Sequence, residues 1–164
     1  MQPKFVIVMG VAGSGKTALG GKLAAALGWD FYDADDYHSN ANVAKMGQGI
    51  PLTDEDRAGW LASLRELVIG CLAKNSPAVL ACSALKESYR QILMQGDDRV
   101  KLVYLYGSYE VIFARMKSRG GHFMKPEMLK SQFEILEEPG EALVVDISLE
   151  MDVIIAQLLN SLRG

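Results

Sequence analysis

Three features are scarce in this sequence of 164 residues: cysteine, long apolar runs and an excess of either charge. The two cysteines, Cys71 and Cys82, follow neither a C-x-x-C pattern nor the spacing of zinc ligands, so we expect reduced thiols. No stretch approaches the roughly 20 apolar residues that span a bilayer, and the N-terminus lacks the pattern of a signal peptide. These absences predict a cytoplasmic protein that does not bind a membrane.

The charge balance argues against nucleic acid as a partner. Seventeen Lys and Arg stand against 20 Asp and Glu, a net charge of −3, which gives no basic field for a polyanion. A GTPase would need a guanine-reading N-K-x-D segment, and the sequence has none. Because the length is that of one domain, we expect a single domain over residues 1–164 that acts on a small molecule.

What the sequence does contain is a phosphate-binding loop. Residues 10–17 match the pattern G-x-x-x-x-G-K-[ST] and lie between an apolar run and a helix-like stretch. Such a loop turns its N–H groups toward a phosphate at a helix N-terminus, the lysine reaches the β- and γ-phosphates, and the hydroxyl after it binds Mg²⁺. The residues predicted to bind ATP are Gly10, Val11, Ala12, Gly13, Ser14, Gly15, Lys16 and Thr17. The alternative is a Gly-rich turn without a ligand, but the strand before it and the helix after it favour the phosphate loop.

Apolar runs typical of buried strands alternate with segments of helical period. The candidate strands are residues 4–9, 30–33, 78–82, 101–106 and 142–146. Their length and apolar centres indicate strands that are covered on both faces of a parallel sheet. Thr53 is placed to cap the helix with the apolar stripe 60–72, and Gly28 to end the helix over 18–27. This alternation predicts an α/β fold with the phosphate loop at the carboxyl edge of the sheet.

Three further segments carry a resemblance to a known family. They run from Asp33 to Trp60, from Cys82 to Arg90 and from His122 to Pro139, and with the phosphate loop they resemble gluconate kinase, in the shikimate-kinase-like branch of the P-loop kinases. The resemblance implies a three-layer fold with a five-stranded parallel sheet and a small lid. It also implies ATP- and Mg²⁺-dependent phosphorylation of D-gluconate at its 6-hydroxyl, giving 6-phospho-D-gluconate and ADP for the pentose phosphate pathway, and it makes a homodimer plausible.

Two other functions remain open. Shikimate kinase, or another small-molecule P-loop kinase, would keep the fold and the mechanism, but the wording from Asp33 to Arg57 and the segment 131–133 favour an aldonate. A nucleotide-binding regulatory module would have no need of the full set of catalytic residues. That set is intact: Lys16, Thr17, Asp33, Asp35 and Arg119.

Asp33 and Asp35 stand two residues apart at the end of a predicted strand. On an extended backbone both side chains face the same side, so one can serve Mg²⁺ while the other accepts a hydrogen bond or a proton from the substrate hydroxyl. The resemblance to shikimate kinase assigns Asp33 to the metal and Asp35 to the substrate and base role. The alternative is a pair of helix-capping or solvated carboxylates.

Four cationic or titratable side chains are candidates for the sugar acid. Arg57 is the first choice for the carboxylate, because a guanidinium pairs with it in a bidentate manner and a helix N-terminus favours an anion. Lys86 and Arg90 can line the pocket from the segment after the third strand, and His38 can hydrogen-bond a sugar hydroxyl. For each of them a surface ion pair or a structural loop contact is the alternative.

A basic stretch with a glycine hinge follows the fourth strand. It contains Arg115 and Arg119, and the hinge Gly120-Gly121 comes directly after. A lid at about 117–128 would exclude water and bring an arginine to the transferring phosphate. We assign Arg119 to the phosphates and Arg115 to the nucleotide, with a solvated basic helix end as the alternative.

Overall fold

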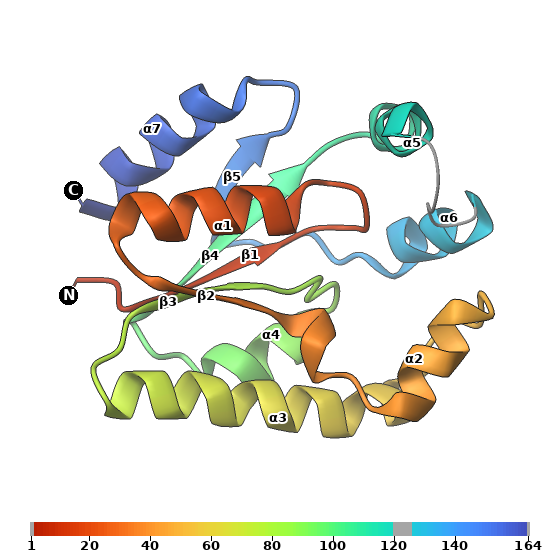
Figure 1. The fold of residues 1–164 in the computed structure, drawn as a ribbon, viewed down its shortest axis with the longest axis horizontal. Coiled ribbons are helices and arrows are strands. Elements are labelled where there is room, and N and C mark those ends of the chain that lie inside the picture. The colour runs from red at the N-terminus through yellow and green to blue at the C-terminus, as the bar shows by residue number, and fades with distance from the viewer. Residues whose placement is uncertain (1, 120–125, 164) are drawn as a thin grey trace.

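The computed structural model describes residues 2–119 and 126–163, apart from the side chains of Arg119 and Pro126. Five parallel strands form one sheet in the order β2-β3-β1-β4-β5 (Figure 1). They are β1 (Phe5–Met9), β2 (Asp30–Asp33), β3 (Ala78–Ala81), β4 (Val100–Tyr106) and β5 (Leu143–Asp146). The predicted α/β fold with a five-stranded parallel sheet is therefore confirmed, and the strand ends differ from the expected ones by at most one residue.

The described helices cover both faces of the sheet. They are α1 (Lys16–Leu27), α2 (Asn40–Gly47), α3 (Asp54–Ala73), α4 (Glu87–Met94), α5 (Tyr109–Arg119), α6 (Pro126–Ile135) and α7 (Met151–Arg163), with a 3₁₀ turn over Ala34–Tyr37. Helices α1 and α7 lie on one face and α3 and α4 on the other, which makes three layers (Figure 1). In the part of the chain that the structure describes, no helix has the length and apolarity needed to cross a membrane.

The central strand β1 joins two hydrophobic clusters. All five of its residues are fully buried, and because successive side chains of a strand point to opposite faces, they divide between two layers. Phe5, Ile7 and Met9 belong to the cluster that packs against α3 and α4. Val6 and Val8 belong to the cluster that includes residues of α1, α5 and α7. A continuous apolar run at β1 is what this two-sided burial requires.

The predicted end of α1 and the predicted cap of α3 are confirmed. Gly28 ends α1 with a φ of 71°, the left-handed conformation in which glycine carries no steric penalty. Thr53 caps α3 through a reciprocal box: its hydroxyl accepts the N–H of Asp56 at 3.1 Å, and the Asp56 carboxylate accepts the N–H of Thr53 at 3.0 Å. The start of α3 is therefore fixed, and with it the position of Arg57.

Both cysteines are buried and unpaired, as predicted. Burial raises the pKa of the Cys82 thiol to about 12. A thiol with that pKa is protonated at neutral pH and is a poor nucleophile.

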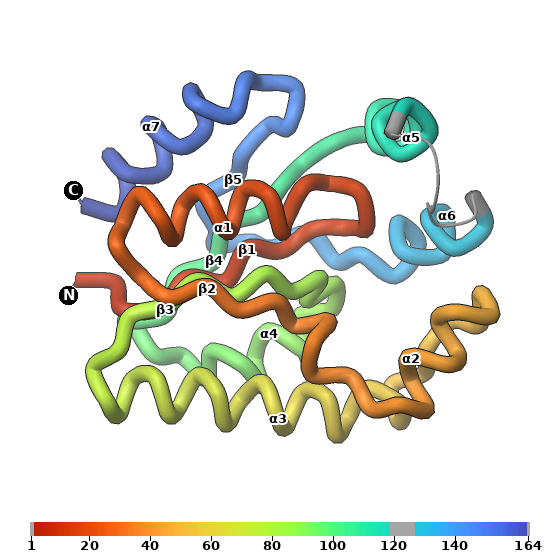
Figure 2. The backbone as a smooth tube through the Cα atoms, in the orientation of Figure 1, coloured from red at the N-terminus to blue at the C-terminus, as the bar shows by residue number. Residues whose placement is uncertain are grey.

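The carboxyl ends of the strands form the working edge of the molecule. The chain termini lie at the opposite end of the sheet, while the phosphate loop, α2 and α6 lie at or beyond the carboxyl edge (Figure 2). Parallel α/β sheets bind their ligands at this edge. Helices α2 and α6, which shape this edge, were not predicted from the sequence.

Candidate active site

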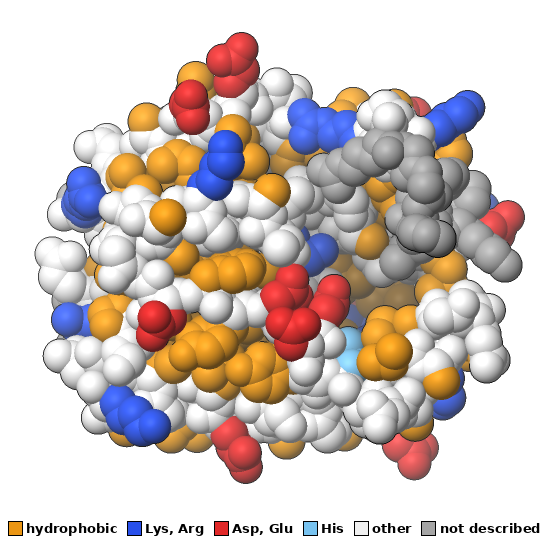
Figure 3. Space-filling view, in the orientation of Figure 1, with side chains coloured by type: hydrophobic (Ala, Val, Ile, Leu, Met, Phe, Trp, Pro, Cys, Tyr) orange, Lys and Arg blue, Asp and Glu red, His pale blue; other side chains and the backbone are white. Residues whose placement is uncertain are grey.

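A cavity of about 340 Å³ lies at the carboxyl edge, between the phosphate loop, α2, α3 and α6. Five of the predicted site residues line it together: Ala12, Lys16, Asp35, His38 and Arg57. The rest of the described lining comprises Met46, Gly47, Gly49, Pro51, Leu52, Trp60, Ser83, Met128, Ser131, Gln132 and Ile135. Acidic side chains gather beside a hollow on this face of the molecule (Figure 3). The fold thus brings together residues from four separate stretches of the chain.

The phosphate loop has the open backbone that its glycines predict. Gly13 has a φ of +78°, and a Cβ there would come within 2.5 Å of the Met116 side chain on α5. A Cβ on Gly10 would come within 2.6 Å of the Ser14 hydroxyl oxygen. Lys16 donates to the carbonyl of Val11 at 3.0 Å, so the lysine folds back across the loop. The loop therefore has the curvature and the cation that a polyphosphate needs.

Thr17 and Asp33 form a direct pair at the foot of the phosphate loop. The hydroxyl of Thr17 donates to the Asp33 carboxylate at 2.8 Å, and the other oxygen of Asp33 accepts the N–H of Asp35 at 2.9 Å. Within the described ranges, no group of three or more His, Cys, Asp or Glu residues could hold a metal unaided. One hydroxyl and one carboxylate suit Mg²⁺, which takes few protein ligands and fills its shell with water and phosphate oxygens. The residues present therefore fit the ion.

Asp35 and Lys16 face the same cavity, and each of these oppositely charged groups shifts the pKa of the other. Partial removal from water raises the pKa of Asp35, and the Asp33 carboxylate raises it further, while Lys16 acts in the opposite direction. Burial lowers the pKa of Lys16, and Asp35 partly offsets this effect. A carboxylate with a raised pKa is a better proton acceptor than an ordinary aspartate.

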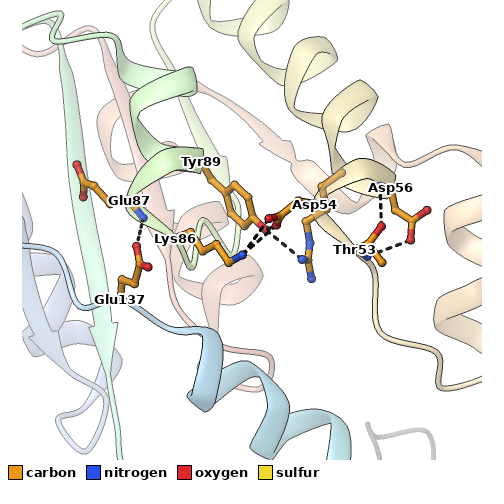
Figure 4. Close-up of polar contacts among 8 residues, drawn as sticks. Thr53, Asp54, Asp56, Lys86, Glu87, Tyr89 and Glu137 are labelled. Carbon is orange, nitrogen blue, oxygen red and sulfur yellow. Dashed lines mark hydrogen bonds and ion pairs between the residues drawn. The ribbon is translucent and has the colours of Figure 1, made fainter.

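A chain of polar contacts holds Arg57 through Tyr89, and Figure 4 shows how it continues from Tyr89 to Asp54 and Lys86. The Arg57 guanidinium donates to the Tyr89 hydroxyl at 3.1 Å and lies 5.6 Å from the centre of that ring. The Tyr89 hydroxyl in turn donates to Asp54, which pairs with Lys86 at 3.0 Å. Tyr89 is buried, so it gives the arginine a fixed anchor. Tyr89 lies in one of the segments that carry the family resemblance, but the sequence predicted no role for it.

The structure does not place Lys86 and Arg90 at the cavity. Lys86 is engaged by Asp54, and its ammonium lies 5.6 Å from the Tyr89 ring centre. Arg90 is only 3% exposed, and its guanidinium donates to the carbonyls of Ala84 at 2.7 Å and Glu137 at 2.8 Å. Its Nε and one terminal nitrogen also donate to the Glu87 carboxylate, at 3.3 and 3.0 Å. A buried arginine whose donors are used in this way stabilises the chain path and has no fork left for a substrate carboxylate. We therefore correct the expected substrate contact of Arg90 to a structural role, and that of Lys86 to support of Asp54.

Gln132 is a residue that sequence analysis did not place in the site. It lies on α6, lines the cavity, and its side-chain oxygen accepts the N–H of Ala12 at 2.7 Å. The wall formed by α6 is thus bonded directly to the phosphate loop. The family segment 131–133 contained this signal, but a neutral amide carries no charge that would single it out.

The predicted lid lies partly outside the described residues. Residues 120–125, which include the glycine hinge, and the side chain of Arg119 are not described. Arg115 donates to the carbonyl of Ile147, which directly follows β5. The contact places Arg115 beside the loop after β5, and its expected role toward the nucleotide stays a prediction.

A family model, two protein sequences and a crystal structure all relate this chain to small-molecule kinases. Residues 12–147 match the family model described as shikimate kinase. The probable gluconokinase of Mus musculus is 49% identical over 154 residues, which cover 84% of each chain. The thermosensitive gluconokinase of Escherichia coli K12 is 48% identical, covering 93% of this chain and 83% of its own length. The crystal structure of a gluconokinase from Sinorhizobium meliloti 1021 superposes with a TM-score of 0.88 at 41% identity, covering 98% of this chain and 92% of that one.

Proposed function

The chain belongs to the family that the shikimate kinase model describes and, within it, to the gluconokinases, and from this premise we propose that it transfers the γ-phosphoryl group of ATP to the 6-hydroxyl of D-gluconate. The products are 6-phospho-D-gluconate and ADP. The observation that carries the proposal is the shared cavity: the phosphate-loop Lys16, the carboxylate of Asp35 and the guanidinium of Arg57 all line it. A group that binds the ATP phosphates, a proton acceptor and a cation that can pair with the substrate carboxylate therefore face one small molecule.

The roles of the residues follow from their chemistry. Arg57 pairs with the carboxylate of the sugar acid, and Asp35 accepts the proton of the attacking hydroxyl. Lys16 and the loop N–H groups hold the phosphates in line and stabilise their charge in the transition state. Thr17 and Asp33 would hold Mg²⁺, which neutralises phosphate charge when bound. Arg119 would join the phosphates from the lid segment, and Arg115 would contact the nucleotide.

Gluconate is favoured over shikimate by the relatives. The family model is described as shikimate kinase, whereas the relatives at 48% and 49% identity are a thermosensitive gluconokinase and a probable gluconokinase. A pathway role in carbohydrate acid catabolism follows from this substrate. A cytoplasmic location and a homodimer stay predictions.

The test is ADP release by the purified protein with ATP and Mg²⁺, measured side by side with gluconate, with shikimate and without an acceptor. We expect release that depends on gluconate and is lost in Lys16→Ala and without Mg²⁺. ADP release that depends on shikimate would show that shikimate, and not gluconate, is the substrate. ATP binding without release that any acceptor stimulates would make the chain a nucleotide-binding regulatory module.

A further inference from the structure

Asn42 is a buried polar residue next to the cavity, and the proposed reaction does not use it. It lies on α2 and is 4% exposed. Its amide nitrogen Nδ2 lies 2.8 Å from the backbone carbonyl oxygen of Asp56 and 3.4 Å from Nδ1 of His38. A buried side chain with two such contacts links α2, the start of α3 and a histidine of the cavity wall.

The contact with Asp56 fixes which way round the amide lies. A backbone carbonyl can only accept a hydrogen bond, so the atom facing it must be the Nδ2 of Asn42, which can only donate. The same nitrogen faces His38 with its second hydrogen. Nδ1 of His38 must therefore accept, and a neutral imidazole that accepts at Nδ1 carries its proton on Nε2.

The ring of His38 is also held in its plane. It stacks on Trp60 with the ring centres 4.3 Å apart and an interplanar angle of 11°. Trp60 is itself fixed, because its indole N–H donates to the carbonyl of Ala34 at 2.7 Å. His38 lines the cavity, so a ring with a fixed plane and a fixed tautomer offers the substrate one defined group.

Burial favours the neutral ring of His38. Burial lowers the pKa of His38, and Arg57 lowers it further, whereas Asp35 acts in the opposite direction. The neutral form, in which the tautomer matters, is thus the form present at neutral pH and above.

We propose that Asn42 is a positioning residue that sets the tautomer of His38, so that the Nε2–H of His38 donates to an acceptor oxygen of the sugar acid. His38 then recognises a hydroxyl or carboxylate oxygen and takes no proton from the attacking hydroxyl, which leaves that task to Asp35. The identity of the substrate rests on the proposed function. The tautomer does not.

The tautomer can be measured directly, because the chain has two histidines, His38 and His122. Long-range ¹H–¹⁵N correlation NMR of the full chain, with His122→Gln to assign the signals, reports which ring nitrogen of His38 is protonated. We expect the Nε2–H tautomer at pH values above the pKa of His38. An Nδ1–H tautomer or an equal mixture of the two would overturn the proposal.

Substitution of Asn42 supplies the second readout. Asn42→Asp places an acceptor at Nδ1, so we expect the tautomer to switch to Nδ1–H, the pKa of His38 to rise, and KM for gluconate to rise about tenfold, the value of one lost hydrogen bond, with kcat nearly unchanged. Asn40→Asp, on the exposed side of the same helix, adds the same charge and should change none of these. An unchanged tautomer in folded Asn42→Asp would refute the assignment, and the wild-type spectrum decides the matter if this variant does not fold.

A third comparison uses His38 itself. Glutamine can place its amide nitrogen near the position of Nε2, whereas asparagine can reach only the position of Nδ1. We expect KM for gluconate to stay closer to the wild-type value in His38→Gln than in His38→Asn, and the reverse order would contradict the proposal. If the protein phosphorylates no gluconate at all, the proposed function fails while the NMR result still stands or falls alone.

Discussion

Replacement of Tyr89 by phenylalanine tests whether the chain of contacts behind Arg57 positions it for the substrate carboxylate. The change removes one hydroxyl, which accepts from Arg57 at 3.1 Å and donates to Asp54. The ring stays, and with it the packing in the core cluster and the contact of 5.6 Å between the guanidinium and the ring centre. Only the anchor that sets the orientation of the guanidinium is lost.

The expected changes in KM and in the free energy of unfolding follow from the charge and exposure of the partners of this hydroxyl. A hydrogen bond to a charged group is worth about 1.5–3 kcal/mol. Arg57 is half-buried and can partly replace the hydroxyl with water, so the lower end applies. About 1.5 kcal/mol corresponds to a rise of about tenfold in KM for gluconate, with kcat within about twofold because Tyr89 does not line the cavity. The free energy of unfolding should fall by about 1 kcal/mol.

Steady-state kinetics with a coupled ADP assay and urea denaturation give the two readouts. Tyr104→Phe is the matched control: Tyr104 is buried in the same cluster, and its hydroxyl donates to Glu138 at 3.1 Å, away from the cavity lining. It should lower stability by a similar amount and leave KM unchanged. Equal KM values in the two variants would show that Tyr89 does not position Arg57.

Three further outcomes are expected. Asp35→Asn should remove most turnover, and because the raised pKa of Asp35 makes its ionised form costly in the folded state, the variant should also unfold at a higher temperature at neutral pH; the wild-type rate should fall as pH drops through a pKa above that of an ordinary aspartate. Gly13→Ala should abolish ATP binding in a titration, since its Cβ would meet the Met116 side chain at 2.5 Å, whereas Gly21→Ala, which has open space within α1, should raise stability by about 1 kcal/mol. Arg90→Met should lower the free energy of unfolding by about 3 kcal/mol in urea denaturation without a change in KM, and a selective rise in KM would restore Arg90 to the substrate.

The strands and the long helices were predictable from the sequence because their signals are local. A buried strand such as β1 shows as an uninterrupted apolar run, and the cap of α3 depends on Thr53 and Asp56, three residues apart. The eight-residue helix α2 has no comparable signal. It exposes most of its side chains, and it is tied to the start of α3 by the ion pair of Lys45 with Asp56 at 2.8 Å, a partner that local periodicity does not reveal.

The candidate site shows the same division. Residue pattern and the family resemblance together predicted the substrate roles of Asp35 and Arg57, and both side chains line one cavity with Lys16. The sequence was not sufficient for Arg90, because the pattern around an arginine in a polar segment is the same whether its side chain faces a ligand or the protein backbone. Its carbonyl partners stand 6 and 47 residues away, and only the folded structure reveals that they use its donors.

The division of β1 between two clusters has an evolutionary consequence. Odd-numbered residues of the strand support the layer with α3, which presents Arg57 and Trp60 to the acceptor side of the cavity. Even-numbered residues support the layer with α1, which follows the phosphate loop. The sheet thus separates the two layers, so mutations that repack the layer with α3 can accumulate while the layer with α1 keeps its packing. A protein lineage with this architecture can therefore change its acceptor substrate and keep its ATP-binding site.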